Sequence, residues 1–380
     1  MTDPWHLSTH PPLPPTTEDG RISWLRLLRS PRIGPRSFHR LLAEYRTAED
    51  ALAALPEIAR ASGDRRYQPC SPDFAAAELR AGSKMGARLL AVGAADYPPL
   101  LMQLDDPPPL LWALGNVALL SRPALAMVGA RNASSLGRRM ARKLAKDIAA
   151  KGIAVVSGLA RGIDTEAHSA ALPYGTIAVQ PGGIDVLYPR ENAELARAIA
   201  GQGLRLSEQP IGMAPQARHF PARNRIVSGL AQATLVVEAA HRSGSLITAD
   251  HAARQGREVL AIPGHPLDPA SGGCNLLVRD GATLIRSCAD ILEAVPAYAA
   301  TPAAPAPAPA PPAPRAMRPL REIADLHRKI LGRLGPSPVA EDQLARDLGA
   351  RADRLAPALT DLEIEGRVTR ETGGTVRRAD

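Results

Sequence analysis

The sequence is poor in cysteine and in aromatic residues, and each shortage argues against a class of protein. Its three cysteines, Cys70, Cys274 and Cys288, are far apart and form no paired ligand spacing. This argues against a disulfide scaffold, a zinc finger and an iron–sulfur site, and it favours a reducing, cytoplasmic location. Aromatic residues make up only 3% of the chain, so the core has to be built from aliphatic side chains.

The sequence also lacks a long apolar run. Asp3, Glu18 and Asp19 occur within the first twenty residues, so this stretch is no secretory signal, and we expect residues 1–20 to form a flexible tail. The most apolar stretch, Leu110–Leu120, is about half the ~20 residues that a membrane span needs. We therefore expect no membrane anchor.

What the sequence does contain is an excess of basic residues, concentrated in its middle. The whole chain carries a net charge of +8. Residues 1–122 contain 14 basic and 13 acidic side chains (+1), residues 123–298 contain 19 and 14 (+5), and residues 315–380 contain 13 and 11 (+2). Arg131–Lys151 alone holds seven basic residues and one acidic residue. A polyanion is therefore expected to bind the middle of the chain.

Composition also divides the chain into domains. Alanine and proline alternate almost without interruption after residue 298, which favours extended polyproline conformations and a semi-rigid linker. We assign the linker to residues 299–319 and a C-terminal module to residues 320–380. Before it, helical periodicity gives way to alternating strands and helices. We place an N-terminal helical domain with its connection at residues 21–95 and a larger domain at residues 96–298.

The larger domain is predicted to contain a doubly wound parallel sheet. Its candidate strands are Ala124–Val128, Ile153–Ser157, Thr176–Gln180, Leu204–Ser207, Thr234–Glu238 and Glu258–Ile262. Helical windows lie between them, such as Leu136–Lys151, where apolar residues recur every four positions. Continuous apolar strands that alternate with helices are typical of an α/β fold with both sheet faces covered. Ligands of such sheets bind at the carboxyl ends of the strands.

Four clusters of candidate binding residues follow these strands. In the first, Gly129 lets the backbone approach a phosphate, Ser134 or Ser135 can cap the next helix and Arg131 adds a bidentate donor. It matches neither the dinucleotide fingerprint nor a Walker motif, and a tight turn with a surface arginine is the alternative. The second cluster contains Gly158 and Arg161. The remaining candidates are Arg218, Phe220, Arg223, Asn224 and Arg225, which suit phosphate pairing and base stacking, and Ser243, Gly244, Ser245 and Thr248, which form a nest of small residues before a helix.

For the last two clusters, the alternatives are a charged surface loop and a capped turn. Asp164, Glu166 and His168 follow the second cluster and could serve as acid and base groups. Asp164 and His168, however, lie one helical turn apart and are expected to bond each other or the backbone. No serine or cysteine nucleophile accompanies them, so we expect no catalytic residue.

In this order the motifs resemble those of the DNA-processing protein A family (DprA, also called Smf). The resemblance runs from Asp96 to Val295 and rests on residues 127–131, 157–168, 220–226 and 243–249. It implies an extended Rossmann-like domain that binds single-stranded DNA, forms a homodimer, and protects incoming DNA and loads RecA onto it during natural transformation. It also implies a protein that is not an enzyme and needs no cofactor or metal. One departure is Ala130, where the family pattern favours a small hydroxyl residue.

The flanking modules resemble known domains less closely. Ile33–Leu42 is similar to a hairpin of sterile-alpha-motif or helix-hairpin-helix domains, but it has one glycine where the DNA-binding hairpin favours two, so a purely structural helical cap remains open. Helices expected at Glu341–Leu348 and Asp353–Glu365, followed by strands around residues 367–370 and 375–377, resemble a winged helix. Whether that module binds DNA or protein is open, because acidic residues offset its arginines.

The alternative function is a nucleotide-processing enzyme of the lysine-decarboxylase-like (LOG) superfamily. Pro181-Gly182-Gly183 superficially matches the Pro-Gly-Gly turn of those enzymes. Their motif then needs a threonine and a paired glutamate, whereas residues 184–189 here read Ile-Asp-Val-Leu-Tyr-Pro. We therefore favour the noncatalytic DNA-binding mediator.

Overall fold

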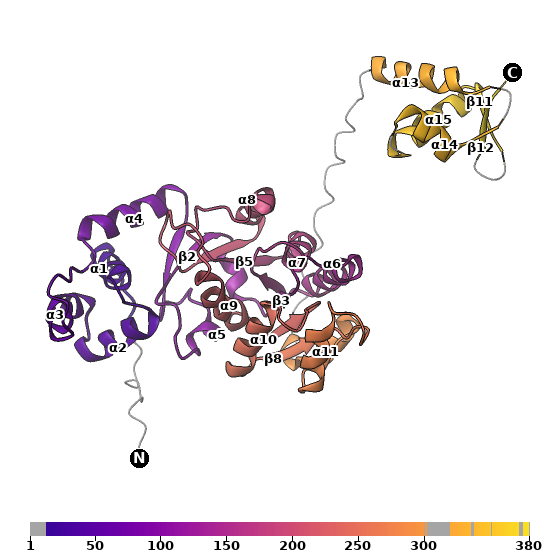
Figure 1. Ribbon diagram of the computed structural model, residues 1–380. Coiled ribbons are helices and arrows are strands. Elements are labelled where there is room, and N and C mark those ends of the chain that lie inside the picture. The colour runs from indigo at the N-terminus through magenta and orange to yellow at the C-terminus, as the bar shows by residue number, and fades with distance from the viewer. Residues whose placement is uncertain are drawn as a thin grey trace. The chain divides into compact units, whose positions relative to one another are not determined.

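The computed structural model describes residues 13–299, 301, 320–335, 338–350, 352–371 and 375–379. The chain divides into two compact units, residues 1–307 and residues 308–380 (Figure 1). The first twelve residues of the expected tail and residues 302–319, most of the expected linker, lie outside the described residues. Within the described ranges, no helix is long and apolar enough to cross a membrane.

Four helices open the first unit, and side-chain caps set where most of them begin. They are α1 (Glu18–Arg29), α2 (Pro35–Tyr45), α3 (Ala48–Ala61) and α4 (Pro72–Lys84). Thr17 and Thr47 accept hydrogen bonds from backbone amides in the first turns of α1 and α3. Helix α2 differs because its N-cap, Gly34, has no side chain to cap it. Trp24 and Phe38 pack edge to face, 5.1 Å between ring centres, in the core of this helical domain.

The rest of the first unit is built on a nine-stranded sheet in the order β1-β2-β6-β5-β4-β3-β7-β8-β9. The strands are β1 (Arg88–Ala91), β2 (Leu110–Gly115), β3 (Ala124–Val128), β4 (Ala154–Ser157), β5 (Thr176–Gln180), β6 (Leu204–Ser207), β7 (Ala233–Val236), β8 (Glu258–Ala261) and β9 (Thr283–Leu284). All neighbouring pairs are parallel except β1 with β2 and β2 with β6. The sheet confirms the predicted fold class.

Helices cover both faces of this sheet, as the continuous apolar strands indicated. They are α5 (Pro99–Met102), α6 (Ser135–Ala150), α7 (Ile163–Ala171), α8 (Ala193–Gln202), α9 (His219–Gly229), α10 (Ser245–Arg254), α11 (Gly272–Arg279) and α12 (Cys288–Ala294), with short 3-10 helices at Val117–Ser121, Arg190–Asn192 and Pro296–Tyr298. Leu125 and Met127 of β3 pack in one core with α6 and α7. Ala124, Ala126 and Val128 pack in the other, with α9, α10 and the N-terminal helices.

The sequence missed three strands at the two edges of the sheet. Strands β1 and β2 extend one edge in the antiparallel direction, and β9 is a two-residue strand at the other edge. Strand β1 precedes residue 96, where we placed the start of the sheet domain. Its residues, Arg88–Ala91, begin with an exposed arginine and lie outside the alternating strand–helix pattern of the larger domain, and their pairing with β2 identifies them as a strand.

The helical domain packs directly on the sheet through a buried ion pair. Arg29 of α1 donates to Glu78 of α4 over 2.9 Å, and the Trp112 indole of β2 donates to the same carboxylate over 2.9 Å. Arg29 also donates to the backbone oxygen of Glu208 over 3.2 Å, just beyond β6. These contacts hold the helical domain close to one end of the sheet strands.

The second unit has a winged-helix fold. Its elements are α13 (Leu320–Arg333), β10 (Val339–Ala340), α14 (Glu341–Leu348), α15 (Ala352–Ile364), β11 (Val368–Glu371) and β12 (Thr375–Arg378), with an antiparallel sheet in the order β10-β12-β11. Helix α14 ends at Gly349, whose φ of +57° is the left-handed conformation that glycine favours. Leu344, Leu359 and Leu362 form part of its own core. Residues 372–374, between the two strands predicted for the wing, lie outside the described residues.

Candidate nucleic-acid interface

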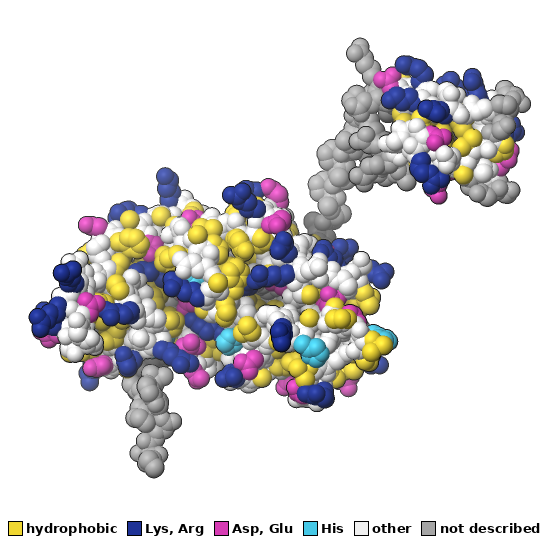
Figure 2. Space-filling view, viewed as in Figure 1, with side chains coloured by type: hydrophobic (Ala, Val, Ile, Leu, Met, Phe, Trp, Pro, Cys, Tyr) yellow, Lys and Arg dark blue, Asp and Glu magenta, His cyan; other side chains and the backbone are white. Residues whose placement is uncertain are grey.

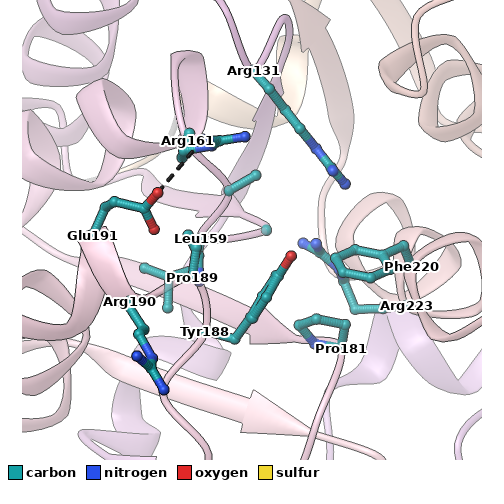
Figure 3. A pocket seen from close by; sticks show the side chains of 12 residues that line it. Arg131, Leu159, Arg161, Pro181, Tyr188, Pro189, Arg190, Glu191, Phe220 and Arg223 are labelled. Atoms are coloured by element: carbon teal, nitrogen blue, oxygen red, sulfur yellow. Dashed lines mark hydrogen bonds and ion pairs between the residues drawn. The ribbon is translucent and has the colours of Figure 1, made fainter. Parts of the chain in front are cut away.

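A cavity of about 440 Å³ lies at the carboxyl ends of β3, β4 and β5, and Figure 3 shows the side chains around it. We call it the arginine cavity. Its walls come from the segments that follow these three strands and from the first two turns of α9. It is lined by Arg131, Gly158, Leu159, Ala160, Arg161, Pro181, Tyr188, Pro189, Arg190, Glu191, Phe220 and Arg223. Five of the residues singled out in the sequence therefore meet here.

Arg131 and two aromatic rings form one wall of the arginine cavity. The guanidinium carbon of Arg131 lies 5.1 Å from the centre of the Phe220 ring. Tyr188 meets the same ring edge to face, with centres 5.8 Å apart. Figure 3 shows Arg131 directed toward Phe220 and the Tyr188 hydroxyl pointing into the cavity. Cationic and aromatic surfaces are thus available together, as contacts to a phosphate and a base require.

Arg223 forms a buried positive floor to the cavity. It is 7% exposed, and a Cβ added at Gly158 would lie 1.5 Å from its Nη1, so a larger residue there would displace the guanidinium. Burial lowers the pKa of Arg223 to about 10, although nearby Asp164 opposes that shift. At neutral pH Arg223 therefore remains charged. Its Nε has no hydrogen-bond partner among the described residues.

Asp164 holds the loop that follows β4. Its carboxylate accepts hydrogen bonds from the backbone amides of Gly158 and Ala160, over 3.1 and 3.2 Å. Burial raises the pKa of Asp164, while the charge of Arg223 and these hydrogen bonds oppose the increase. Asp164 thus shapes the cavity from behind and is itself largely hidden from solvent.

His168 is a structural residue, which confirms the expectation that it bonds the backbone. The fully buried ring accepts from the Leu159 amide at Nε2 over 3.3 Å, and its Nδ1 lies 2.7 Å from Thr176 Oγ1. Since the Thr176 hydroxyl donates to the Val155 oxygen, Nδ1 carries the proton. Burial lowers the pKa of His168 to about 3. Glu166 instead pairs with Arg142 over 2.7 Å, so the three residues form no acid–base constellation.

Gly129 and Ser134 shape the turn between β3 and α6 and do not line the cavity. The Ser134 hydroxyl donates to Glu238, its amide donates to the same carboxylate over 2.9 Å, and its oxygen accepts from the Gly137 amide over 3.0 Å. A Cβ at Gly129 would lie 2.6 Å from Ile163. The contacts of Gly129 and Ser134 hold this turn against Ile163 of α7 and against Glu238, which follows β7. Arg131 projects from the same turn.

Arg225 lies on another side of α9 and is engaged in ion pairs. Its Nη2 donates to Glu208 over 2.7 Å, and its Nε lies 3.6 Å from Asp106. With Arg218 it lines a second cavity of about 700 Å³ between α9 and the helical domain. Asn224 is half-buried and lines neither cavity. The cluster at residues 218–225 thus contributes to both cavities, because its side chains leave α9 in different directions.

The small-residue cluster that opens α10 also lies outside the arginine cavity. Ser243 and Ser245 bond each other through their hydroxyls over 2.7 Å, and Ser245 and Thr248 are buried. Gly244 precedes the first helical residue, and a Cβ there would meet nothing within 4 Å. Five of the fourteen candidate residues, from the first three clusters, therefore line the arginine cavity, and those of the fourth cluster do not.

Sequence reasoning missed the contribution of the loop after β5. Tyr188 and Glu191 line the cavity with Arg190, and Glu191 pairs with Arg161 over 3.5 Å, both side chains being 59% exposed. Figure 3 shows Arg190 directed away from Arg131 and Arg223. The position of this loop in the sequence could have indicated its role, because it directly follows a predicted parallel strand, as the other clusters do.

Basic side chains are spread over one face of the first unit (Figure 2). Figure 2 shows Lys and Arg side chains spread across this face of the first unit, several of them near its centre. In Figure 1 the same central region contains α9, with the N-terminal helices on one side and α6 and α7 on the other. A polyanion lying across this face would therefore meet positive charge in more than one place.

Family models match all three parts of the chain. The model for DNA recombination-mediator protein A matches residues 88–296. The DprA-like N-terminal HHH domain matches residues 18–81, and the DprA winged helix domain matches residues 301–374.

Individual relatives are also similar. The DNA processing protein DprA of Bacillus subtilis is 43% identical over 221 residues, which cover 57% of this chain and 74% of the relative. The X-ray structure of DprA from Streptococcus pneumoniae superposes with a TM-score of 0.57 at 36% identity, over 69% of this chain and 98% of that one. DprA from Helicobacter pylori, whose structure gives insights into its single-stranded DNA binding mode, superposes with a TM-score of 0.51 at 31% identity, over 55% and 94%.

Proposed function

The chain belongs to the DNA recombination-mediator protein A family, and from this premise we propose that it binds single-stranded DNA at the arginine cavity. The observation that carries the proposal is the convergence of Arg131, Arg223 and Phe220 at the carboxyl ends of the strands. Phosphates would pair with exposed Arg131 and Arg161, and a base would stack against the Phe220 and Tyr188 wall.

The residues of the proposed interface differ in their roles. Gly158 admits the Arg223 guanidinium, and Arg161 can exchange its exposed partner Glu191 for a phosphate, because such a surface pair contributes only about 0–1 kcal/mol. Gly129 and Ser134 act by positioning Arg131. We place Ser243, Gly244, Ser245, Thr248 and Asn224 outside the arginine cavity and assign them no contact there.

We further propose that the bound strand is protected and handed to RecA during natural transformation, by a homodimer in the cytoplasm. The similarity to DprA proteins supports this proposal. RecA-dependent ATP hydrolysis on a single strand should start sooner in the presence of the protein, and Arg131→Ala should abolish that effect. Sedimentation should give a dimer. If wild-type protein left the lag before ATP hydrolysis unchanged, the proposed transfer to RecA would be contradicted. If the protein sedimented as a monomer at every concentration, the proposed homodimer would be contradicted.

Catalysis forms no part of the proposed function. Glu238, which precedes the Ser243-Gly244-Ser245 nest in sequence, accepts hydrogen bonds from the Ser134 hydroxyl and amide. No group of His, Cys, Asp and Glu side chains in the described part of the chain could hold a metal ion. Incubation with nucleoside monophosphates and labelled single strands, with and without magnesium, should release no base and shorten no strand. Turnover that disappears in Glu238→Gln would establish an enzyme instead.

The decisive binding experiment compares three ligands: a fluorescent single strand, a duplex of the same sequence and a nucleoside monophosphate. The single strand should bind most tightly, with affinity falling steeply with salt at a log–log slope of about −0.7 per neutralised phosphate. A preference for the nucleoside monophosphate would favour a nucleotide-processing site, and affinity independent of salt would rule out phosphate contacts as its source.

A further inference from the structure

Glu191 is the only acidic residue among the described residues that line the arginine cavity. The other charged residues of that lining are four arginines. Glu191 contacts one of them, Arg161, with 3.5 Å between its Oε1 and the arginine Nη1. In Figure 3 the Glu191 carboxylate lies beside Arg161 and away from Phe220. A cavity whose arginines attract anions therefore also contains one negative charge that opposes their binding.

The ion pair with Arg161 contributes little to the stability of the fold. Both side chains are 59% exposed. Water and salt screen a pair of this kind, and forming it immobilises two long side chains. Stabilisation of the folded chain is therefore a weak reason for a carboxylate at position 191, and its effect on a bound anion is the larger consequence.

The segment that carries Glu191 is held in place by the next residue. Asn192 is 5% exposed, and its side-chain amide donates to the backbone oxygens of Leu159 and Ala160 over 2.9 and 3.1 Å. These two oxygens belong to the segment after β4 that also carries Arg161. The carboxylate and the guanidinium thus project from two segments that are bonded to each other. A phosphate that binds Arg161 therefore lies within reach of the Glu191 side chain.

The charge of a phosphate group depends on how it is linked. A phosphodiester within a strand carries one negative charge. A phosphomonoester, as in a free nucleotide, carries about 1.5–2 negative charges at neutral pH, because its second pKa is about 6. Coulombic repulsion is proportional to the product of the charges, so Glu191 repels a monoester up to about twice as strongly as a diester in the same place.

We propose that Glu191 is a specificity-determining residue, which favours the phosphodiesters of a strand over phosphomonoesters such as free nucleotides. The arginines attract both kinds of phosphate, and they attract the more highly charged one more strongly. The carboxylate opposes this additional attraction and shifts the preference of the cavity toward the diester. The inference rests on the proposed function, because it concerns which phosphates the proposed DNA-binding site accepts.

Two thymidine compounds isolate the charge of the phosphate. Thymidine 5′-monophosphate and its methyl ester share the same sugar and base, but the methyl ester is a diester with one negative charge. Each compound competes with a fluorescent oligothymidylate, and the inhibition constants are compared for wild type, Glu191→Gln and Glu191→Asp. Glu258→Gln is the matched control, because Glu258 is exposed at the amino end of β8, whereas the cavity lies at the carboxyl ends of the strands.

Glu191→Gln should tighten the binding of the monophosphate several-fold more than the binding of the methyl ester, because the variant no longer repels the additional charge. Glu191→Asp retains the carboxylate and should keep a ratio of the two inhibition constants close to that of wild type. Glu258→Gln should change neither constant. Added salt should reduce the difference between wild type and Glu191→Gln, since it screens an exposed charge.

An equal effect of Glu191→Gln on the two compounds, or no effect on either, would overturn the proposal. If the monophosphate competed with neither wild type nor Glu191→Gln, the carboxylate would not be what excludes it, and the proposal would fail as well. If Glu191→Asp lost as much discrimination as Glu191→Gln, the shape of the side chain would be responsible and not its charge. A wild-type protein that bound no fluorescent strand would instead refute the proposed function itself.

Discussion

The guanidinium of Arg131 lies against the face of the Phe220 ring, 5.1 Å from its centre. From the sequence, we expected Arg131 to pair with a phosphate and Phe220 to stack on a base. Their contact means that each orients the other, because the ring holds the guanidinium over the cavity and the cation covers one face of the ring. Their contributions to DNA binding are therefore expected to be coupled.

This coupling can be measured in a double-mutant cycle. Arg131→Ala should weaken all sequences alike and reduce the salt slope by about 0.7, since one phosphate contact is lost. Phe220→Ala should cost roughly 1–3 kcal/mol of binding free energy with little change in slope. The double variant should lose about 0.5–1 kcal/mol less than the sum, the size of an exposed cation–π contact. Additive losses would show that the two residues act independently, and equal slope changes would show that their roles are wrongly assigned.

Because Gly158 lies so close to Arg223, we expect the substitution Gly158→Ala, which adds one methyl group, to weaken both folding and DNA binding. In Gly158→Ala the added Cβ would collide with Nη1, so the buried guanidinium has to move. We expect a loss of about 1–3 kcal/mol in the free energy of unfolding and roughly tenfold weaker single-strand binding. Denaturant titration and fluorescence anisotropy measure the two effects.

Gly201→Ala is the matched control for that substitution. Gly201 lies in α8, and a Cβ there meets nothing within 4 Å. Alanine should raise stability by up to ~1 kcal/mol and leave binding unchanged. If Gly158→Ala were as harmless as this control, Arg223 would not be held in the observed position.

Glu238 should prove to be a stabilising residue. Its carboxylate accepts from the Ser134 amide and hydroxyl at the N-terminus of α6, where negative charge is favourable. Glu238→Gln should therefore lower the free energy of unfolding by about 0.5–2 kcal/mol. Glu57→Gln, at an exposed position in the interior of α3, should change it little. Equal stability of the two variants in urea would argue against this capping role.

His168 should make stability depend on pH. Its pKa is lowered by burial to about 3 from an ordinary value of 6.5, so between these values the unfolded chain binds more protons than the folded one. The free energy of unfolding should rise with pH over this window, by up to about 1.4 kcal/mol per unit, and its contribution should be complete above pH 6.5.

A His168→Gln variant isolates this contribution. Asp164 and Glu208, whose pKa values are raised by burial, act in the opposite sense above their ordinary values. They are common to both proteins and cancel in the difference. Denaturation at a series of pH values should show that the difference between wild type and variant increases from acid to neutral pH. A constant difference would indicate that His168 titrates normally.

Most of the sheet was predictable because its signals are local. The predicted strand Thr176–Gln180 matches β5, and Leu136–Lys151 matches α6 to within one residue at each end. A buried strand is recognised in a sequence by a short apolar run that ends in a turn, and a helix is recognised by the periodic spacing of its apolar residues. Edge strands such as β1 have no such signal, because their existence depends on pairing with a partner distant in the chain.

The composition of the site was partly predictable for a related reason. Parallel strands place their carboxyl ends at the same edge, so Arg131, Gly158 and Arg161 could be expected near one another. Tyr188 could have been included by the same argument, since its loop follows β5. Its role as a wall of the cavity becomes visible only from its contact with Phe220.

Residue order along the chain thus set the strands, the helices and the edge of the sheet where the arginines gather, since each depends on patterns a few residues long. Tertiary packing determined which neighbouring residues each arginine contacts. Arg223 and Arg225 are two positions apart, and in the sequence they are equivalent. Packing of α9 between the sheet and the helical domain turns Arg223 toward Gly158 and Arg225 toward Glu208, because a helix rotates by about 100° per residue and its neighbours fix where each direction leads.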